Sequence, residues 1–303
     1  MAEVDLAPLW QWMIDRELIR ERKEKGTIPV LTADPILGKY RFCNVRREDD
    51  RVTKWIAENI RKPFHNHPLL WYMLCIARQI NWPPTLGYLI EEMWPNLEVY
   101  TPELMSRALI DYQSHGHKVF TGAYMIRAES DPKAKWYNWP KVKYISEIVC
   151  GKLWEDRQFW AKYWAGNGYL LGEHLEPTLQ LTHRRLMNHT GWGPFMAYQA
   201  VVDMRFTPLL AGAPDVSCWA AAGPGTIRGL NRLAGRPVDA PLKQDRALTE
   251  ILMIYAATTS PIGPGIAVDL SDIPNCLCEY DKWARVKNGE GKPRALYVPG
   301  RGA

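Results

Sequence analysis

The stretch Gly191-Trp192-Gly193-Pro194-Phe195-Met196-Ala197-Tyr198-Gln199 decides how the fold is read, because it places a tight turn between two helical patterns. Leucines at helical spacing precede it, and small apolar residues follow it. Two glycines allow backbone angles that a Cβ would forbid, and they leave bare amide groups at the start of the second helix. Such amides bind phosphate well, so Gly191, Trp192 and Gly193 are predicted to form a phosphate-binding turn.

Composition is that of a globular protein with a mildly basic balance. The chain has 303 residues, 47% of them hydrophobic and 23% charged, and a formal net charge of +5. This charge is compatible with a polyanionic partner. The 14 tryptophans either fill the core or stack on bases. The six cysteines are scattered and lack the spacing of a zinc site. No signal peptide or membrane-spanning run is seen, so we expect the protein in a reducing cytoplasm with its thiols free.

Hydrophobic periodicity predicts a mainly α fold. Pro29 and Pro35 indicate an extended strap after a first helix, and a further helix is expected to begin near Glu48. Residues 115–126 could form a short strand or helix, and 128–141 an exposed loop. We predict one domain over 1–303, with lobes 1–165 and 166–303 around a central cleft. The expected helices cover 7–24, 68–80, 84–93, 102–113, 141–163, 175–188, 194–209, 225–234 and 243–256.

Residues 40–53, Tyr40-Arg41-Phe42-Cys43-Asn44-Val45-Arg46-Arg47-Glu48-Asp49-Asp50-Arg51-Val52-Thr53, contain a dense set of charges. At helical spacing Arg47, Asp50 and Arg51 share one face, and Asn44 lies near its start. Guanidinium groups bind phosphate oxygens in bidentate fashion, which favours an anion site. The alternative is an internal ion-pair lattice, with Asn44 as a helix cap.

Two more stretches carry polar groups that could do chemistry. Gly223-Pro224-Gly225-Thr226-Ile227-Arg228-Gly229-Leu230 is a glycine-rich turn before a helix, where Arg228 could bind phosphate. It is not a nucleotide-binding P-loop, because no Gly-Lys-Ser/Thr follows. In 272–283, Asn275, Glu279 and Lys282 fall on one helical stripe, which could line a pocket or face water.

Taken together, these blocks resemble one family. They are Asn44-Val45…Arg47…Asp50-Arg51-Val52-Thr53, Phe120-Thr121-Gly122-Ala123-Tyr124, Gly223-Pro224-Gly225-Thr226-x-Arg228-Gly229-Leu230 and Asn275…Cys278-Glu279…Lys282. They are similar to the α-glutamyl/putrescinyl-thymine pyrophosphorylases, which are phage amino acid:DNA transferases. The helical domain of phage 5-hydroxymethyluracil DNA kinases belongs to the same group. The resemblance covers roughly residues 8–298, and the hairpin with its trailing Asp215 resembles the helix-hairpin-helix of DNA glycosylases.

The resemblance implies a DNA-glycosylase-like fold and a role in thymine hypermodification. A kinase first makes 5-(pyrophosphoryloxymethyl)uracil in double-stranded DNA, and the transferase then lets an amino acid or polyamine displace pyrophosphate. The expected setting is the cytoplasm of a phage-infected bacterium, with a functional link to the 5-hydroxymethyluracil DNA kinase. No cofactor is expected, although Mg²⁺ could bridge the pyrophosphate. The target base must be extruded from the duplex, and which aromatic side chain acts as a wedge is left open.

The residues receive roles from this chemistry. Arg47, Arg51 and Arg228 would neutralise the departing pyrophosphate. Asp215 is the first choice for the base that deprotonates the amine, and Glu279 the second. Lys282 or Lys118 would hold a carboxylate or a phosphate. The other residues expected to contact substrate or pyrophosphate are Asn44, Thr121, Asp203 and Asn275, and Gly225 is expected to join the hairpin in contacting DNA.

Two alternatives from other functional classes remain. A glycosylase that excises a modified pyrimidine would use Asp215 to support the transition state, although Phe195 and Met196 stand where a lyase would carry its nucleophilic lysine. A non-catalytic helical module that assists a kinase would bind duplex DNA and tolerate the loss of Asp215 and Glu279. The sequence leaves the amine nucleophile open.

Overall fold

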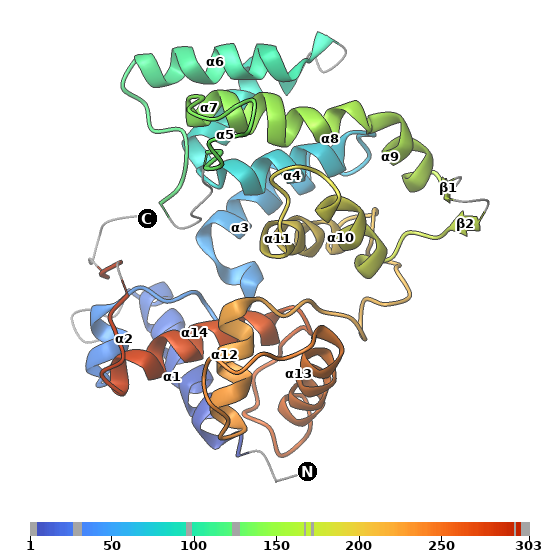
Figure 1. The fold of residues 1–303 in the computed structure, drawn as a ribbon. Helices are drawn as coiled ribbons and strands as arrows, with labels where there is room; N and C mark the ends of the chain where they lie inside the picture. The colour runs from blue at the N-terminus through green and yellow to red at the C-terminus, as the bar shows by residue number, and fades with distance from the viewer. Residues whose placement is uncertain are drawn as a thin grey trace. The chain divides into compact units, whose positions relative to one another are not determined.

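The computed structural model describes residues 5–26, 32–94, 99–122, 128–166, 168–170, 173–293 and 295–297, and these residues are mainly helical (Figure 1). Contacts divide the chain into unit 1, Met1–Asp50 with Ser217–Ala303, and unit 2, Arg51–Val216. This division differs from the expected lobes 1–165 and 166–303, because the first helix packs against the last. Within the described ranges no helix is long and apolar enough to cross a membrane.

Unit 1 is built around its last helix, α14 (Asp272–Lys287). This helix contacts α1 (Ala7–Glu24), α2 (Pro35–Lys39), α12 (Pro224–Leu233) and α13 (Gln244–Thr258), as Figure 1 also shows. The apolar faces of these helices are buried, so α14 is the centre of the unit 1 core.

Close packing of α12 on α14 accounts for the glycine-rich stretch. A Cβ at Gly225 would clash with the Cys278 side chain, and one at Gly229 with the Leu277 carbonyl. Thr226 adds a hydrogen bond from its Oγ1 to the Pro274 carbonyl, 3.0 Å long. The two glycines therefore allow two helix backbones to approach each other, and the predicted DNA contact of Gly225 has no support from this packing.

Unit 2 is a larger set of helices around α4 (Leu70–Ile80), every residue of which is buried. Trp71 of α4 stacks on Trp160, with ring centroids 5.1 Å apart. Two short strands, β1 (Gly168–Leu170) and β2 (Glu173–Leu175), pair antiparallel. The other described helices of unit 2 are α3 (Arg51–Ile56), the π-helical η2 (Ala57–Arg61), α5 (Pro83–Glu92), α6 (Pro102–Ser114), α7 (Lys141–Lys143), the π-helical η4 (Tyr144–Cys150), α8 (Gly151–Glu155), α9 (Arg157–Trp164), α10 (Leu179–Met187) and α11 (Pro194–Arg205).

The predicted hairpin forms between α10 and α11 of unit 2. Gly191 has a φ of +80°, and a Cβ there would clash with the Val149 side chain. Trp192 is buried, and its Nε1 donates a hydrogen bond of 3.1 Å to the Val149 carbonyl. The Trp192 side chain therefore anchors the turn to η4, and a contact of its backbone with DNA stays a prediction. Gly193 precedes α11 and has open space around it, so DNA binding through its neighbouring amides stays a prediction.

Several predicted elements differ in detail from the structure. Pro35 begins α2, capped by the Asp34 side chain, instead of continuing an extended strap, because proline suits the first turn of a helix. The helix expected near Glu48 begins at Arg51, after a 3-10 turn, η1 (Arg47–Asp49). The expected helix 141–163 is divided into α7, η4, α8 and α9. Residues 115–122 form neither helix nor strand, while Pro29 and 123–126 lie outside the described residues.

Candidate functional site

In unit 1, a non-helical segment, residues 42–45, is held between α1 and α14 by side chains from both helices. From α1, Arg16 Nε donates to the Cys43 carbonyl (3.0 Å), and its Nη2 donates to the Phe42 carbonyl (3.1 Å). From α14, Glu279 Oε2 accepts from the Cys43 amide at 2.9 Å. Asn275 Nδ2 donates to the carbonyl of Asn44 at 3.2 Å. These contacts join parts of the chain that are far apart in sequence.

Glu279 and Lys282 form an ion pair on the α14 face that meets this segment. Their side chains are 2.5 Å apart, and the Lys282 ammonium lies 4.7 Å from the centre of the Phe42 ring. Burial, the largest single influence, lowers the pKa of Lys282, but the charge and hydrogen bond of Glu279 together with the neighbouring Cys43 and Cys278 raise the pKa overall. Lys282 is therefore a cation, and about a quarter of its side chain is exposed. The predicted stripe of Asn275, Glu279 and Lys282 does lie on one face of α14.

Arg16 is a member of this cluster that the sequence did not single out. Its side chain is buried, and burial lowers its pKa. Besides its two backbone bonds it donates to Asn44 Oδ1 at 2.8 Å. Its Nη1 is buried and has no hydrogen-bond partner within the described part of the chain. Arg16 follows Leu9 and Met13 at helical spacing, so it lies on the apolar face of α1. A charged residue on an apolar helix face is the sequence signal that could have identified Arg16.

Asn44, Arg47 and Asp50 complete the cluster. The Asn44 amide donates to Asp50 Oδ1 (2.8 Å), and the Arg47 amide donates to Asp272 Oδ1 at the start of α14 (2.8 Å). Burial raises the pKa of Asp50 to about 6, although the Asn44 amide and the Arg47 charge oppose this rise. Asn44 is not a helix cap, and Arg47 and Asp50 do not share a helical face, since Asp50 is extended. Their proximity comes from the turn.

Arg228 lies on the other side of α14. It forms ion pairs with Asp281, at 3.1 Å, and with Asp239. Asp281 is two positions after Glu279, which places it about 200° around the helix. Arg228 therefore belongs to an ion-pair lattice remote from Glu279, and its predicted contact with pyrophosphate has no support from this position.

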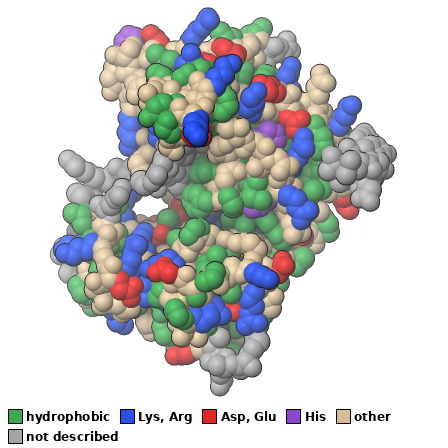
Figure 2. Space-filling model, viewed as in Figure 1, with side chains coloured by type: hydrophobic (Ala, Val, Ile, Leu, Met, Phe, Trp, Pro, Cys, Tyr) green, Lys and Arg blue, Asp and Glu red, His purple; other side chains and the backbone are tan. Residues whose placement is uncertain are grey.

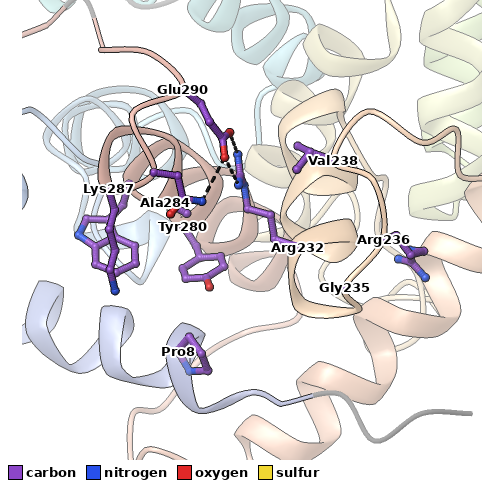
Figure 3. A pocket seen from close by; sticks show the side chains of 11 residues that line it. Pro8, Arg232, Gly235, Arg236, Val238, Tyr280, Ala284, Lys287 and Glu290 are labelled. Carbon is purple, nitrogen blue, oxygen red and sulfur yellow. Dashed lines mark hydrogen bonds and ion pairs between the residues drawn. The ribbon is translucent and has the colours of Figure 1, made fainter.

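A hollow of about 530 Å³ is lined by residues of α12 and α14, among them Arg232 (Figure 3), which pairs with Asp281 as Arg228 does. Its arginines are already matched by carboxylates: Arg232 pairs with Asp281 and Glu290, and Arg236 with Glu250 at 2.7 Å. An anion entering here would have to displace these partners, so the hollow is a weaker candidate than the cluster beside Glu279. It is lined by Pro8, Arg232, Gly235, Arg236, Val238, Tyr280, Trp283, Ala284, Lys287, Asn288 and Glu290.

Two predicted acids belong to unit 2, where each has a structural partner. Asp203 is buried in α11 and accepts from Arg78 Nε (2.5 Å) and Nη2 (2.8 Å), which ties α11 to α4. Asp215 accepts from the amides of Leu179 (2.8 Å) and Gln180 (2.9 Å) at the start of α10. Both Asp215 oxygens are thereby used to cap a helix, which leaves its role as a base without geometric support.

The remaining predicted residues of unit 2 lie on its surface or in its loops. Arg51 begins α3 and is exposed. The Lys118 ammonium lies 4.0 Å from the centre of the Trp82 ring, and the Thr121 amide donates to the Ile80 carbonyl at 3.1 Å. Tyr124, part of the same motif, lies outside the described residues. Among the residues that the structure describes, no group of three or more His, Cys, Asp or Glu side chains is arranged to hold a metal ion.

One comparison with known proteins finds a match. The family model described as 5-hmdU DNA kinase, helical domain, matches residues 4–293, nearly the whole chain. No curated protein and no solved structure matches the chain.

Proposed function

This chain belongs to the family of the 5-hmdU DNA kinase helical domain, and from that premise we propose that it is a transferase of thymine hypermodification in DNA. Its substrate would be 5-(pyrophosphoryloxymethyl)uracil in double-stranded DNA of a phage, and an amino acid or polyamine would displace pyrophosphate. The family supports a setting in 5-hydroxymethyluracil DNA modification, and the transfer step is what the resemblance of the sequence blocks to the thymine pyrophosphorylases implies.

The observation that carries the proposal is the cluster between α1 and α14. Arg16, Arg47 and Lys282 supply three positive charges, and Asp50, Glu279 and Asp272, whose Oδ1 accepts from the Arg47 amide, supply up to three negative charges. The cluster gathers its cations around Nη1 of Arg16, a buried guanidinium nitrogen without a hydrogen-bond partner within the described part of the chain. An anion is the ligand that such a cluster favours, and pyrophosphate is the anion that leaves in this reaction.

In the proposed step, the amine nitrogen attacks the exocyclic methylene carbon of the uracil. The bond from this carbon to the pyrophosphate oxygen breaks, and pyrophosphate leaves with the electron pair. The new ammonium loses one proton to the Glu279 carboxylate, while Lys282, Arg47 and Arg16 stabilise the departing anion. Asn44 and Asn275 position the 42–45 segment through their hydrogen bonds.

The proposal changes the order of the two candidate bases. Glu279 becomes the base, because it adjoins the cation cluster, whereas the Asp215 oxygens cap α10. Arg51, Lys118, Thr121, Asp203 and Arg228 are not needed in this version of the site. The hairpin at Gly191 and Gly193 is proposed to contact the DNA backbone, and Mg²⁺ remains an optional companion of the pyrophosphate.

The test uses a duplex that carries 5-(pyrophosphoryloxymethyl)uracil, incubated with the protein and a pool of amino acids and polyamines. The DNA is then digested to nucleosides, and their masses are measured by mass spectrometry. We expect a nucleoside that has gained one amine, with pyrophosphate released. Glu279→Gln should lower the rate by about 100-fold or more, the usual contribution of a general base. Arg47→Ala should abolish turnover with the fold intact. Asp245→Asn, an exposed acid of unit 1, is the matched control and should react like the unchanged protein.

Other outcomes select the alternatives. An abasic site with release of a free base would identify a glycosylase. A non-catalytic DNA-binding module is a second candidate, because the family is described as one domain of a kinase. That candidate predicts DNA binding without any new nucleoside, and an increase in kinase turnover when the chain is added.

A further inference from the structure

Positive charge on the face in Figure 2 is scattered and interspersed with acidic side chains. Many of the arginines are matched by carboxylates, as Arg20 is by Glu17 and Arg236 by Glu250. Such pairs neutralise charge within the protein, so they do not mark a surface for a polyanion. Cations that are held in place without a carboxylate are more informative.

Three lysines of unit 2 are held in that way, each by an aromatic ring. The ammonium of Lys118 lies 4.0 Å from the Trp82 ring centre, that of Lys141 lies 4.4 Å from Phe120, and that of Lys143 lies 4.3 Å from Trp139. None of the three forms an ion pair with a carboxylate in the described part of the chain. A ring face attracts and positions an ammonium but does not neutralise its charge.

The three pairs are linked through short pieces of chain. Val119 is buried between Lys118 and Phe120, and Val142 between Lys141 and Lys143, so Lys141 and Lys143 leave α7 on the two flanks of its buried side, about 200° apart. The Lys141–Phe120 contact joins the two pieces. We call Trp82, Lys118, Phe120, Trp139, Lys141 and Lys143 the lysine–aromatic surface.

Two acids of the preceding turn, Glu129 and Asp131, accept hydrogen bonds within that turn. Glu129 accepts from the amides of Ser130 and Asp131 and from Trp136 Nε1, the last at 2.9 Å. Asp131 accepts from the Lys133 amide at 2.9 Å. Lys133 and Lys135, in the same turn, are exposed and balance the two negative charges of Glu129 and Asp131.

We propose that the lysine–aromatic surface binds the phosphate backbone of duplex DNA. Its ammonium groups keep their charge and are held in fixed directions, so they lose little side-chain freedom when a phosphate arrives. The inference rests on the proposed function only for the choice of duplex DNA as the polyanion, and it requires no turnover. It also gives Lys118 a different role from the substrate contact expected from the sequence.

The experiment measures binding of a fluorescently labelled, unmodified duplex by anisotropy over a series of salt concentrations. The test variant combines Lys118→Ala, Lys141→Ala and Lys143→Ala. The matched control combines Lys62→Ala, Lys152→Ala and Lys162→Ala, which removes the same charge from exposed positions of unit 2. A duplex RNA of the same sequence and anionic lipid vesicles are tested in parallel.

We expect the test variant to bind at least tenfold more weakly, and the slope of log Kd against log salt to fall by about 2 to 3, since each phosphate contact contributes about 0.9. The control should keep the wild-type slope. Equal weakening by both variants, or a loss confined to RNA or vesicles, would overturn the proposal. If the alanine variant unfolds, the corresponding triple Lys→Gln variant replaces it. Glutamine keeps much of each side-chain stem and removes the same three charges, so the same loss of DNA binding is expected. The binding assay uses unmodified DNA, so its result does not depend on turnover. A loss of DNA binding in the test variant can therefore be told apart from a failure of the proposed transferase activity.

Discussion

Replacing Asp50 by Asn should make the protein more stable at neutral pH and leave it nearly unchanged in acid. Asp50 lies in the charged cluster of unit 1, where burial raises its pKa from 3.8 to about 6. Asparagine has almost the same shape and keeps an oxygen that can accept from the Asn44 amide, now 2.8 Å away. The substitution therefore removes the titration with little change in packing.

The sign and size follow from linkage. Below the unfolded pKa of 3.8 the carboxyl is protonated in both states, so it contributes nothing to the pH dependence. Between that value and about 6 the folded state keeps a proton that the unfolded state has lost, so the free energy of unfolding falls as pH rises. The two pKa values differ by about 2.2, equivalent to about 3 kcal/mol at full ionisation. Asp50 is partly exposed by surface area, and solvent screens its charge. The value of about 3 kcal/mol is therefore an upper limit for the change in the free energy of unfolding.

The assay is urea unfolding of both proteins at about pH 5 and about pH 8, where the gain from Asp50→Asn should differ by about 1.5 kcal/mol, larger at the higher pH. Groups that do not interact with Asp50 titrate alike in the two proteins and cancel. Asp245→Asn, which removes an exposed carboxylate, should show the wild-type difference between the two pH values. An Asp50→Asn gain that is equal at both pH values, or larger in acid, would refute the reasoning.

Three further substitutions test the structural assignments. Asp203→Ala should lower the free energy of unfolding by about 3–5 kcal/mol, because it leaves the buried Arg78 guanidinium without its carboxylate. Urea unfolding measures this loss, and a loss below about 1 kcal/mol would contradict a structural role for the pair. Gly229→Ala should destabilise by about 1–3 kcal/mol, because its Cβ meets the α14 backbone, whereas Gly212→Ala, which has open space, should not. Asp215→Asn should lower the melting temperature through the loss of about 1 kcal/mol of capping but keep transferase turnover within twofold. A tenfold loss of turnover in Asp215→Asn would restore Asp215 as the base.

Local pattern was sufficient for most of the helices and for the polar stripe of α14, but not for α2, the start of α3 or the division of 141–163. Asn275, Glu279 and Lys282 share a face because positions three and four apart always do so on a helix. The hairpin glycine Gly191 was predicted for the same kind of local reason, since its positive φ is a property of the turn. The 3-10 turn at Arg47 was not predicted, because hydrogen bonds to Asp272 and within the turn override the helical spacing there.

The sequence by itself determined the mainly helical content, the turn between α10 and α11, and the relation to the helical domain of 5-hmdU DNA kinases. Only the tertiary structure decided which polar residues share a site. Arg16 meets Asn44, and Glu279 meets Cys43 across a sequence separation of 236 residues, which no local pattern encodes. The same folding assigns Asp215 to a helix cap and Arg228 to an ion pair on the far side of α14. A carboxylate or guanidinium acquires its role from the groups that burial places beside it, and those groups come from distant parts of the chain.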